Sequence, residues 1–82
     1  MYLTYILYSE SIKKFYTGQT EDIERRILEH NNGKTSFMKS GMPWIKVYSE
    51  EFESRSEAMN LEKKIKKRGA QRFLTDQGID FG

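Results

Sequence analysis

A run of aromatic and β-branched residues at the start of the chain, followed by a polar turn and a second such run, predicts two β-strands. Residues 2–9, YLTYILYS, are rich in aromatic and β-branched side chains and form too short a run for most helices. Residues 10–14 are polar and typical of a turn, and β character resumes at residues 15–17 until Gly18 stops it. The two segments predict a hairpin, whose register stays open because its connection is longer than a two-residue turn.

Apolar residues at helical spacing follow the hairpin: Ile23, Ile27 and Leu28. Thr20 is the expected N-cap of this helix, and the acidic residues at 21 and 22 place negative charge in its first turn. The helix should end near His30, because residues 31–33 are two asparagines and a glycine, which are common at helix ends and in turns.

The middle of the chain predicts an irregular connection and then a third strand. Residues 34–42 contain Ser, Thr and Gly with space for one helical turn, and Pro43 ends this segment. Residues 44–52, WIKVYSEEF, have the composition of a strand.

A second helix is predicted from its capping residues. Ser54 and Glu57, three residues apart, form a capping box at its start. Its core face is expected to carry Ala58, Leu61 and Ile65. Gly69 should end this helix, and residues 72–74 predict a short final helix before the carboxyl-terminal tail.

The predicted order is strand, strand, helix, strand, helix, short helix, which indicates the α+β class. A hairpin without alternating crossover helices favours a small, three-stranded antiparallel sheet flanked by helices. The chain fits a single domain over residues 1–82, a size at which folding buries only about 60% of the unfolded surface. We therefore expect any functional site to be a shallow cleft.

Composition excludes several classes of protein. The chain has no cysteine, which excludes a disulfide framework and a thiolate metal site. No apolar run approaches the roughly 20 residues that span a bilayer, and the amino terminus lacks a signal-peptide pattern. We therefore expect a cytoplasmic protein without a membrane partner.

Basic residues concentrate near the carboxyl end of the second predicted helix. The net charge is only +2, but residues 63–72 hold six basic residues and no acidic one. This block is a candidate surface for the phosphates of a nucleic acid. Cations are also favoured at a helix carboxyl end by the helix dipole, so the charge run by itself favours an ordinary solvated surface.

Arg26 and His30 are the first candidates for chemistry, because a spacing of four places them on one helix face. An arginine beside the apolar stripe can hold a phosphate through two hydrogen bonds. A histidine there can donate to the same phosphate or transfer a proton near neutral pH. Taken alone, the pair favours the simpler alternative of a surface arginine and a histidine stabilised by the helix dipole.

Tyr5 and Tyr16 are expected on neighbouring strands. Strand tyrosines usually pack, and a hydroxyl with a pKa near 10 is a poor base at neutral pH unless a cation lowers that pKa. Glu62 falls on the core-facing side of the second helix, where a carboxylate needs a cation or hydrogen bonds. Neighbouring lysines are one candidate partner, and Mg²⁺, which prefers hard oxygen ligands, is the other.

At this spacing, these residues resemble the GIY-YIG nuclease family, in particular its short single-domain members related to the catalytic domain of the UvrC repair protein. LTY at residues 3–5 takes the position of GIY, and YTG at residues 16–18 takes that of YIG. Tyr16, Arg26 and His30 follow Tyr5 by 11, 21 and 25 residues, as in the family. The similarity continues through LEKKIKK and covers about residues 2–68.

The resemblance implies a role for each candidate. Glu62 would bind one divalent metal ion, Mg²⁺ or Mn²⁺, and Tyr5 would help to activate the attacking water. Arg26 would hold the scissile phosphate, while Tyr16 and His30 would orient groups or transfer protons. The residues expected to contact the nucleic acid are Lys34, Lys39, Lys63, Lys66, Lys67 and Arg68.

Two further positions complete the comparison with the family pattern. Gly18 would permit a close turn from strand into helix. Larger members carry an asparagine after the metal-binding glutamate, but no asparagine follows Glu62, and Gln71 and Gln77 are the candidate substitutes.

The resemblance implies a metal-dependent endonuclease that hydrolyses phosphodiester bonds in DNA, with a place in DNA repair or processing. Binding mainly through phosphates would give it weak sequence specificity. The alternative is a nucleic-acid-binding domain of the same fold that does not cut, or that cuts only with a protein partner that supplies specificity. The complete set of five site residues favours the enzyme.

Overall fold

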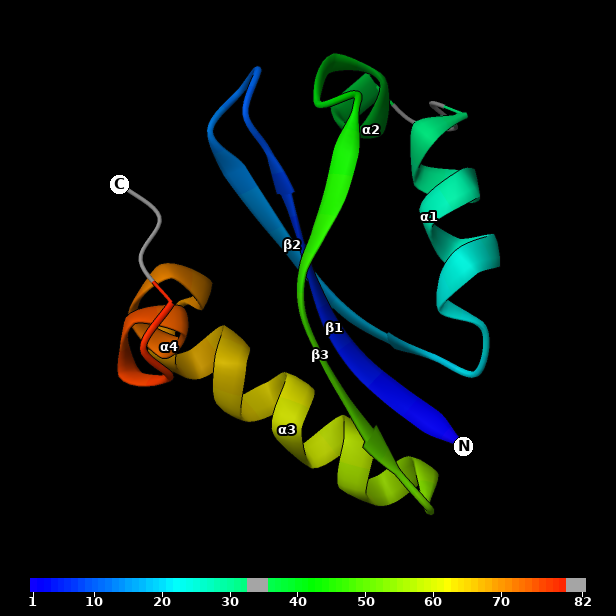
Figure 1. The fold of residues 1–82 in the computed structure, drawn as a ribbon, viewed down its shortest axis with the longest axis vertical. Helices are drawn as coiled ribbons and strands as arrows, with labels where there is room; N and C mark the ends of the chain where they lie inside the picture. The colour runs from blue at the N-terminus through cyan, green and yellow to red at the C-terminus, as the bar shows by residue number, and fades with distance from the viewer. Residues whose placement is uncertain (33–35, 80–82) are drawn as a thin grey trace.

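The computed structural model describes residues 1–32 and 36–79 and has one antiparallel sheet with helices on both faces (Figure 1). The strands are β1 (Tyr2–Ser9), β2 (Lys14–Thr20) and β3 (Trp44–Phe52). Their order in the sheet is β2-β1-β3, so the first strand of the chain lies in the centre and β2 forms an outer edge. The predicted three-stranded antiparallel sheet and α+β class are confirmed.

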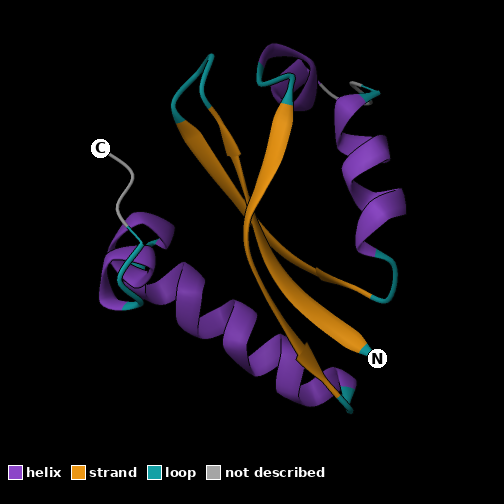
Figure 2. Cartoon of the chain, in the orientation of Figure 1, coloured by secondary structure: helices purple, strands orange, loops and turns teal. Residues whose placement is uncertain are grey.

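The helices divide between the two faces of the sheet. They are α1 (Ile23–Asn31), α2 (Ser36–Ser40), α3 (Arg55–Arg68) and α4 (Ala70–Asp76). Figures 1 and 2 show α1 on one side of the twisted sheet and α3 with α4 on the other. The helical turn expected in the connection before β3 is the short helix α2. No helix in the described ranges has both the length and the apolar character needed to cross a membrane.

Alternation along β1 supplies a separate core for each face of the sheet. On the α3 side, Ile6 packs with a buried cluster from α3 and α4: Ile65, Phe73 and Leu74. On the α1 side, Tyr5 and Leu7 pack with Trp44 at the start of β3. Since successive strand residues point to opposite faces, one strand serves both cores.

The hairpin differs from its prediction at both ends of β2. Its register pairs Ser9 with Lys14, and Lys13 adopts the left-handed region with a φ of 54° to complete the turn. The strand does not stop at Gly18 but continues to Thr20, so Gly18 is an interior residue of β2 that pairs with Tyr5. The predicted role of Gly18 in a turn from strand into helix is therefore wrong.

Helix caps are correctly predicted for α3 but not for α1. Ser54 caps α3, accepting a hydrogen bond from the backbone N–H of Glu57 at 3.3 Å and donating to its carboxylate at 2.9 Å. The cap of α1 is Asp22, whose side chain accepts from the Arg25 N–H at 3.1 Å. Thr20 lies one step earlier, where its hydroxyl accepts from the Asp22 N–H at 3.1 Å, because β2 runs further than predicted.

The apolar stripe predicted for α1 is only partly correct. Ile23 and Ile27 pack against the core on this face, as expected. Leu28 does not, since its side chain is 65% exposed. The face of α1 that turns toward the sheet instead carries His30, which is 1% exposed.

Candidate active site

Gly18 determines how the two tyrosines meet on the α1 face of the sheet. Tyr5 in β1 pairs with Gly18 in β2, and Leu7 pairs with Tyr16, so both tyrosines project from the same face. Their ring centroids lie 6.4 Å apart at an interplanar angle of 26°. A Cβ at Gly18 would lie 2.7 Å from the hydroxyl oxygen of Tyr5 and 2.9 Å from its Cζ. The missing side chain thus lets the Tyr5 ring lie across β2, with its hydroxyl over the edge strand.

His30 is buried beside these tyrosines. Its ring meets Tyr16 edge-on with centroids 4.4 Å apart and meets Tyr5 at 6.4 Å. Nδ1 lies 2.9 Å from the carbonyl oxygen of Arg26, one helical turn earlier. A carbonyl only accepts hydrogen bonds, so Nδ1 carries the hydrogen and Nε2 of the neutral ring has the free lone pair.

The environment of His30 favours the uncharged ring. Burial lowers the pKa of His30 below its usual value, and the nearby positive charge of Arg26 also lowers it. The Arg26 carbonyl and Glu29 act in the opposite direction but more weakly than burial. Nε2 is buried and has no hydrogen-bond partner among the described residues. His30 therefore presents an unused acceptor within the aromatic cluster, and not the solvated, dipole-stabilised cation of the simpler alternative.

Two residues without a predicted site role hold His30 in place. The side chain of Asn31 accepts from the backbone N–H of Trp44 at 2.6 Å and donates to its carbonyl at 3.2 Å. These two hydrogen bonds tie the end of α1 to the start of β3. The Trp44 ring lies 6.2 Å from His30 and donates its Nε1–H to the carbonyl of Met38 at 3.0 Å. The sequence places Asn31 at a helix end, but it has no local signal for this long-range pair.

Arg26 lies at the rim of the cluster. Its side chain is 40% exposed and, among the described residues, its guanidinium forms a long ion pair of 3.7 Å with Glu29. Its charge is close enough to lower the pKa of both Tyr5 and His30. Arg26 and His30 thus share one side of α1, as their spacing predicts, but His30 is buried while the guanidinium stays accessible to a ligand.

Glu62 approaches the same point from α3, on the other face of the sheet. Its side chain is 19% exposed, and its carboxylate accepts from Lys66 Nζ at 2.8 Å. The charge of Glu62 acts on the hydroxyl of Tyr5. This effect is possible because α3 packs directly on β1, where the hydroxyl of Thr4 donates to the carbonyl of Ala58 at 2.6 Å.

Tyr5 itself is far from being a base in this environment. Burial is the main cause that raises the pKa of the Tyr5 hydroxyl above its usual value, and proximity to Tyr16 raises it further. The carboxylates of Glu62 and Glu29 also raise this pKa, and only Arg26 lowers it. Without additional positive charge, the Tyr5 hydroxyl stays protonated at neutral pH.

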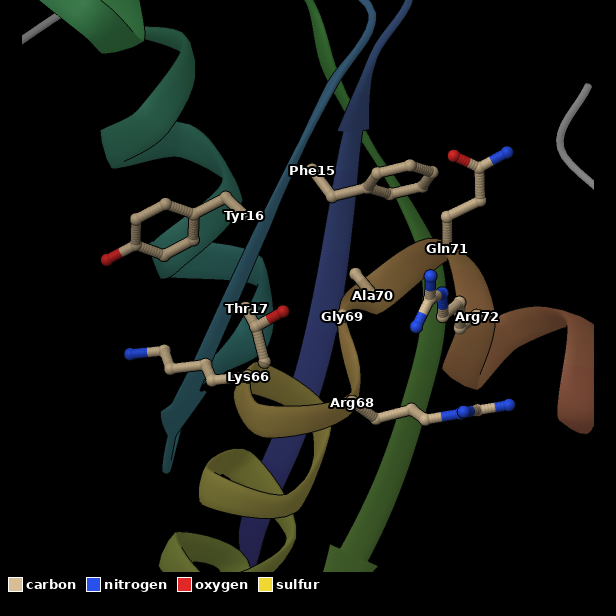
Figure 3. A pocket seen from close by; sticks show the side chains of 9 residues that line it. All are labelled: Phe15, Tyr16, Thr17, Lys66, Arg68, Gly69, Ala70, Gln71 and Arg72. Carbon is tan, nitrogen blue, oxygen red and sulfur yellow. The ribbon is translucent and has the colours of Figure 1, made fainter.

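An open groove of about 710 Å³ lies between β2 and the junction of α3 and α4. Tyr16 and Lys66 point to one side of it in Figure 3, while Phe15 points away toward the α4 side. Arg68 and Gln71 also line this groove. Gln71 therefore shares a surface with Tyr16.

The remaining basic candidates lie on neighbouring parts of the surface. Lys67 and Gln77 line a second hollow of about 510 Å³, which shares Arg68 with the groove but does not include Tyr16. Arg68 already makes a double hydrogen bond with Asp76, at 2.9 and 3.1 Å. Lys39 and Lys63 are exposed on α2 and α3. The prediction for Lys34 falls outside the described residues.

The model of the GIY-YIG catalytic domain matches residues 1–74 of this chain. This chain belongs to the GIY-YIG family. The predicted family is confirmed, and it is a family of nucleases, whose substrates are nucleic acids.

Relatives of this GIY-YIG domain occur in bacteria and archaea. A UPF0213 protein of Limosilactobacillus reuteri is 35% identical over 98% of this chain and 88% of its own length. One of Staphylococcus saprophyticus is 43% identical over 72% of this chain and 73% of its own length. One of Haloquadratum walsbyi is 37% identical over 87% of this chain and 83% of its own length. No solved structure matches this chain.

The oxygen ligands of this GIY-YIG domain fit a magnesium ion that the substrate helps to hold. No group of three His, Asp or Glu side chains suited to a metal occurs within residues 1–32 and 36–79, which argues against an all-protein cage there. Glu62 offers one hard carboxylate near the Tyr5 hydroxyl. Mg²⁺ commonly binds through one or two carboxylates, several waters and substrate phosphates. One carboxylate such as Glu62 would suffice only for an ion that waters and substrate phosphates also hold.

Proposed function

We propose that this GIY-YIG domain is a metal-dependent endonuclease that hydrolyses phosphodiester bonds in DNA with weak sequence specificity. The observation that carries the proposal is the packing of Tyr5, Tyr16 and His30, whose ring centroids lie 4.4–6.4 Å apart, with Arg26 one helical turn before His30. Arg26 from α1 and Glu62 from α3 both act on Tyr5, from opposite faces of the sheet. A tyrosine that only fills space in the core does not require a charged side chain on either side of it.

Arg26 is the group suited to hold the scissile phosphate. Its guanidinium is accessible and always charged, and it can donate two parallel hydrogen bonds to phosphate oxygens. Glu62 is suited to hold Mg²⁺, which when bound would neutralise charge on the phosphate and lower the pKa of nearby hydroxyls. The open groove beside Tyr16 and Lys66, the ion-pair partner of Glu62, gives a large substrate access to this side of β2.

Tyr5 is the group suited to orient the attacking water. Its raised pKa keeps the proton on the hydroxyl until positive charge arrives at the site, so the hydroxyl is inert in the absence of substrate and metal. The packed ring, 1% exposed, fixes the direction in which the hydroxyl points. Such fixed positioning is itself a source of catalysis.

His30 and Tyr16 are suited to accept and relay a proton. With Nδ1–H bound to the Arg26 carbonyl, Nε2 of the neutral ring is available as an acceptor beside Tyr16. The lowered pKa of His30 keeps this lone pair available at neutral pH.

A metal-dependent cleavage assay tests the proposal. Labelled DNA and RNA substrates, duplex, nicked and single-stranded, would be incubated with Mg²⁺ or Mn²⁺ and with a chelator. The test variant is Glu62→Gln, which keeps the size of the side chain, and the matched control is Glu53→Gln, an exposed carboxylate just before α3. We expect products that require metal and are lost in Glu62→Gln only. Metal-dependent products from folded Glu62→Gln at the wild-type rate would overturn the proposal.

A second candidate function is a nucleic-acid-binding domain that does not cut, or that cuts only with a protein partner. The ion pair between Lys66 and Glu62 favours it, because the lysine already neutralises the carboxylate. Exposed pairs at this helical spacing are worth only about 0.3–0.5 kcal/mol, so a divalent ion with a substrate phosphate can displace Lys66. Binding of nucleic acid by wild type without any Glu62-dependent product would favour this second function.

A further inference from the structure

A second cluster of positive charge adjoins the candidate active site. A hollow of about 250 Å³ lies where the end of β2 meets the first turns of α1 and α3. Three arginines line it, Arg25 and Arg26 from α1 and Arg55 from α3, against a single carboxylate, Glu21. Arg26 thus belongs both to the rim of the active site and to this hollow, which we call the arginine hollow.

Among the described residues, Arg26 has a long ion pair of 3.7 Å with Glu29, whereas the other two arginines of this hollow form no ion pair. The guanidinium of Arg55 lies over the ring of Tyr2, 5.5 Å from its centroid, which orients the side chain and leaves its hydrogen-bond donors available. Within the described residues, neither Arg25 nor Arg55 has a carboxylate within 4.0 Å. This contrasts with Arg68, which Asp76 engages through two hydrogen bonds.

Three like charges around one small hollow repel each other unless an anion joins them. The repulsion between like charges is modest at exposed side chains such as Arg25 and Arg55, but an anion between them turns repulsion into attraction. Phosphate suits guanidinium groups in particular, since each arginine can donate two parallel hydrogen bonds to it. The charge excess and the accessible donors therefore indicate a phosphate ligand.

We propose that the arginine hollow binds a second backbone phosphate of the nucleic-acid strand that is cut, upstream or downstream of the scissile phosphate. This inference rests on the proposed function and specifies its substrate. Arg55 and Glu62 are seven residues apart on α3, which corresponds to about 10 Å along the helix axis at about 1.5 Å per residue. The rise of about 3.4 Å per nucleotide is measured along the duplex axis, and neighbouring phosphates of one strand lie farther apart than that rise, so this distance corresponds to at most about three nucleotide steps.

The shared residue Arg26 connects the two phosphate positions. The strand would pass from the Tyr5 hydroxyl at the edge of β2 toward the amino ends of α1 and α3. The substrate must therefore extend beyond the cut on that side far enough to carry this second phosphate, about one to three nucleotides. A substrate that ends nearer to the cut on that side loses the contacts with Arg25 and Arg55.

The test compares two double variants that remove the same charge. Arg25→Gln/Arg55→Gln removes two arginines of the hollow, and Lys14→Gln/Lys46→Gln removes two exposed lysines near the opposite end of the sheet. Both are made in a Glu62→Gln background, and their binding to a labelled DNA duplex is measured by fluorescence anisotropy at several salt concentrations. The duplex carries 5′-hydroxyl ends, so only internal phosphodiesters can occupy the hollow.

The expected result is a flatter salt dependence for the arginine variant alone. Loss of two phosphate contacts lowers the slope of log K against log salt by about 1.8, which is about a tenfold smaller loss of affinity between 50 and 200 mM salt. Arg25→Lys/Arg55→Lys keeps the charge but not the paired donors, so it should keep the slope and bind more weakly. With Glu62 restored, Arg25→Gln/Arg55→Gln should raise KM and leave kcat within about twofold, because neither side chain touches the scissile phosphate.

Each contrary result has a separate meaning. Equal salt slopes and equal KM for the arginine and lysine variants would overturn the second phosphate site and leave the endonuclease proposal intact. A fall in kcat at unchanged KM would also overturn it, since Arg25 and Arg55 would then act at the scissile bond. If the wild-type protein neither binds nor cuts any nucleic acid, both proposals are wrong.

Discussion

Substitution of Gly18 by alanine tests whether the Tyr5 hydroxyl depends on the missing side chain. The new Cβ would lie 2.7 Å from Oη and 2.9 Å from Cζ of Tyr5, and 3.2 Å from Cε1 of Tyr16. Ordinary contacts are about 3.5–4.0 Å, so the Tyr5 ring must move by nearly 1 Å against a packed core. Overpacking of this kind costs about 1–3 kcal/mol, whereas alanine in an unstrained strand position stabilises by about 0.4–1 kcal/mol.

We therefore expect Gly18→Ala to lose about 1–2 kcal/mol of the free energy of unfolding. For a domain of this size, that loss lowers Tm by roughly 5–15 °C. A displacement of nearly 1 Å should also reduce the cleavage rate by about 100-fold. Urea unfolding followed by circular dichroism gives the first quantity, and the cleavage assay gives the second.

The double variant Gly18→Ala/Tyr5→Phe separates this contact from a general effect of alanine. Removing Oη removes the nearest atom, so the penalty of alanine should shrink by at least about 0.5 kcal/mol in the Tyr5→Phe background. Two results would refute the reasoning. One is a Gly18→Ala protein as stable as wild type, and the other is an equal penalty in both backgrounds.

Three further predictions concern the same site and the basic helix. Tyr5→Phe should reduce cleavage by about 100-fold or more, and Tyr8→Phe on the other face should change it little; equal effects would remove the role of Tyr5. Because burial lowers the pKa of His30, its contribution to stability is complete above the unfolded pKa of about 6.5 and is lost as the pH falls through the folded pKa. Urea midpoints should show a smaller acid loss in His30→Gln, and an unchanged loss would contradict this. A last variant reverses the charge of four lysines on α3: Lys63, Lys64, Lys66 and Lys67. It should weaken DNA binding and flatten the salt dependence of binding in an anisotropy titration, and an unchanged salt slope would place the DNA on another surface.

The sequence predicts the elements well because local chemistry determines them. Ser54 has its capping partner three residues away, and Gly69 ends α3 as expected. The cap of α1 is harder to predict from the sequence. Thr20 and Asp22 are both good capping residues, and the register of the hairpin decides between them. That register depends on pairing across the sheet, which no local signal contains.

The candidate site is predictable as a set of residues but not as an arrangement. The spacing of Arg26 and His30 places them on one side of α1, yet burial of the ring depends on contacts with Tyr16 and Trp44. The role of Gly18 depends likewise on a ring from the neighbouring strand. In both cases, the deciding contact joins segments far apart in the sequence.

The aromatic cluster on the α1 face serves as half of the hydrophobic core as well as a candidate catalytic centre. In a relative that has lost activity, selection for folding alone would still retain Tyr5, Tyr16 and His30. Arg26 and Glu62 carry charges that the apolar core does not need, so selection for chemistry is the main reason to retain both. Among members of this family, the joint loss of these two charged residues would therefore mark chains that keep the fold after catalysis has been abandoned.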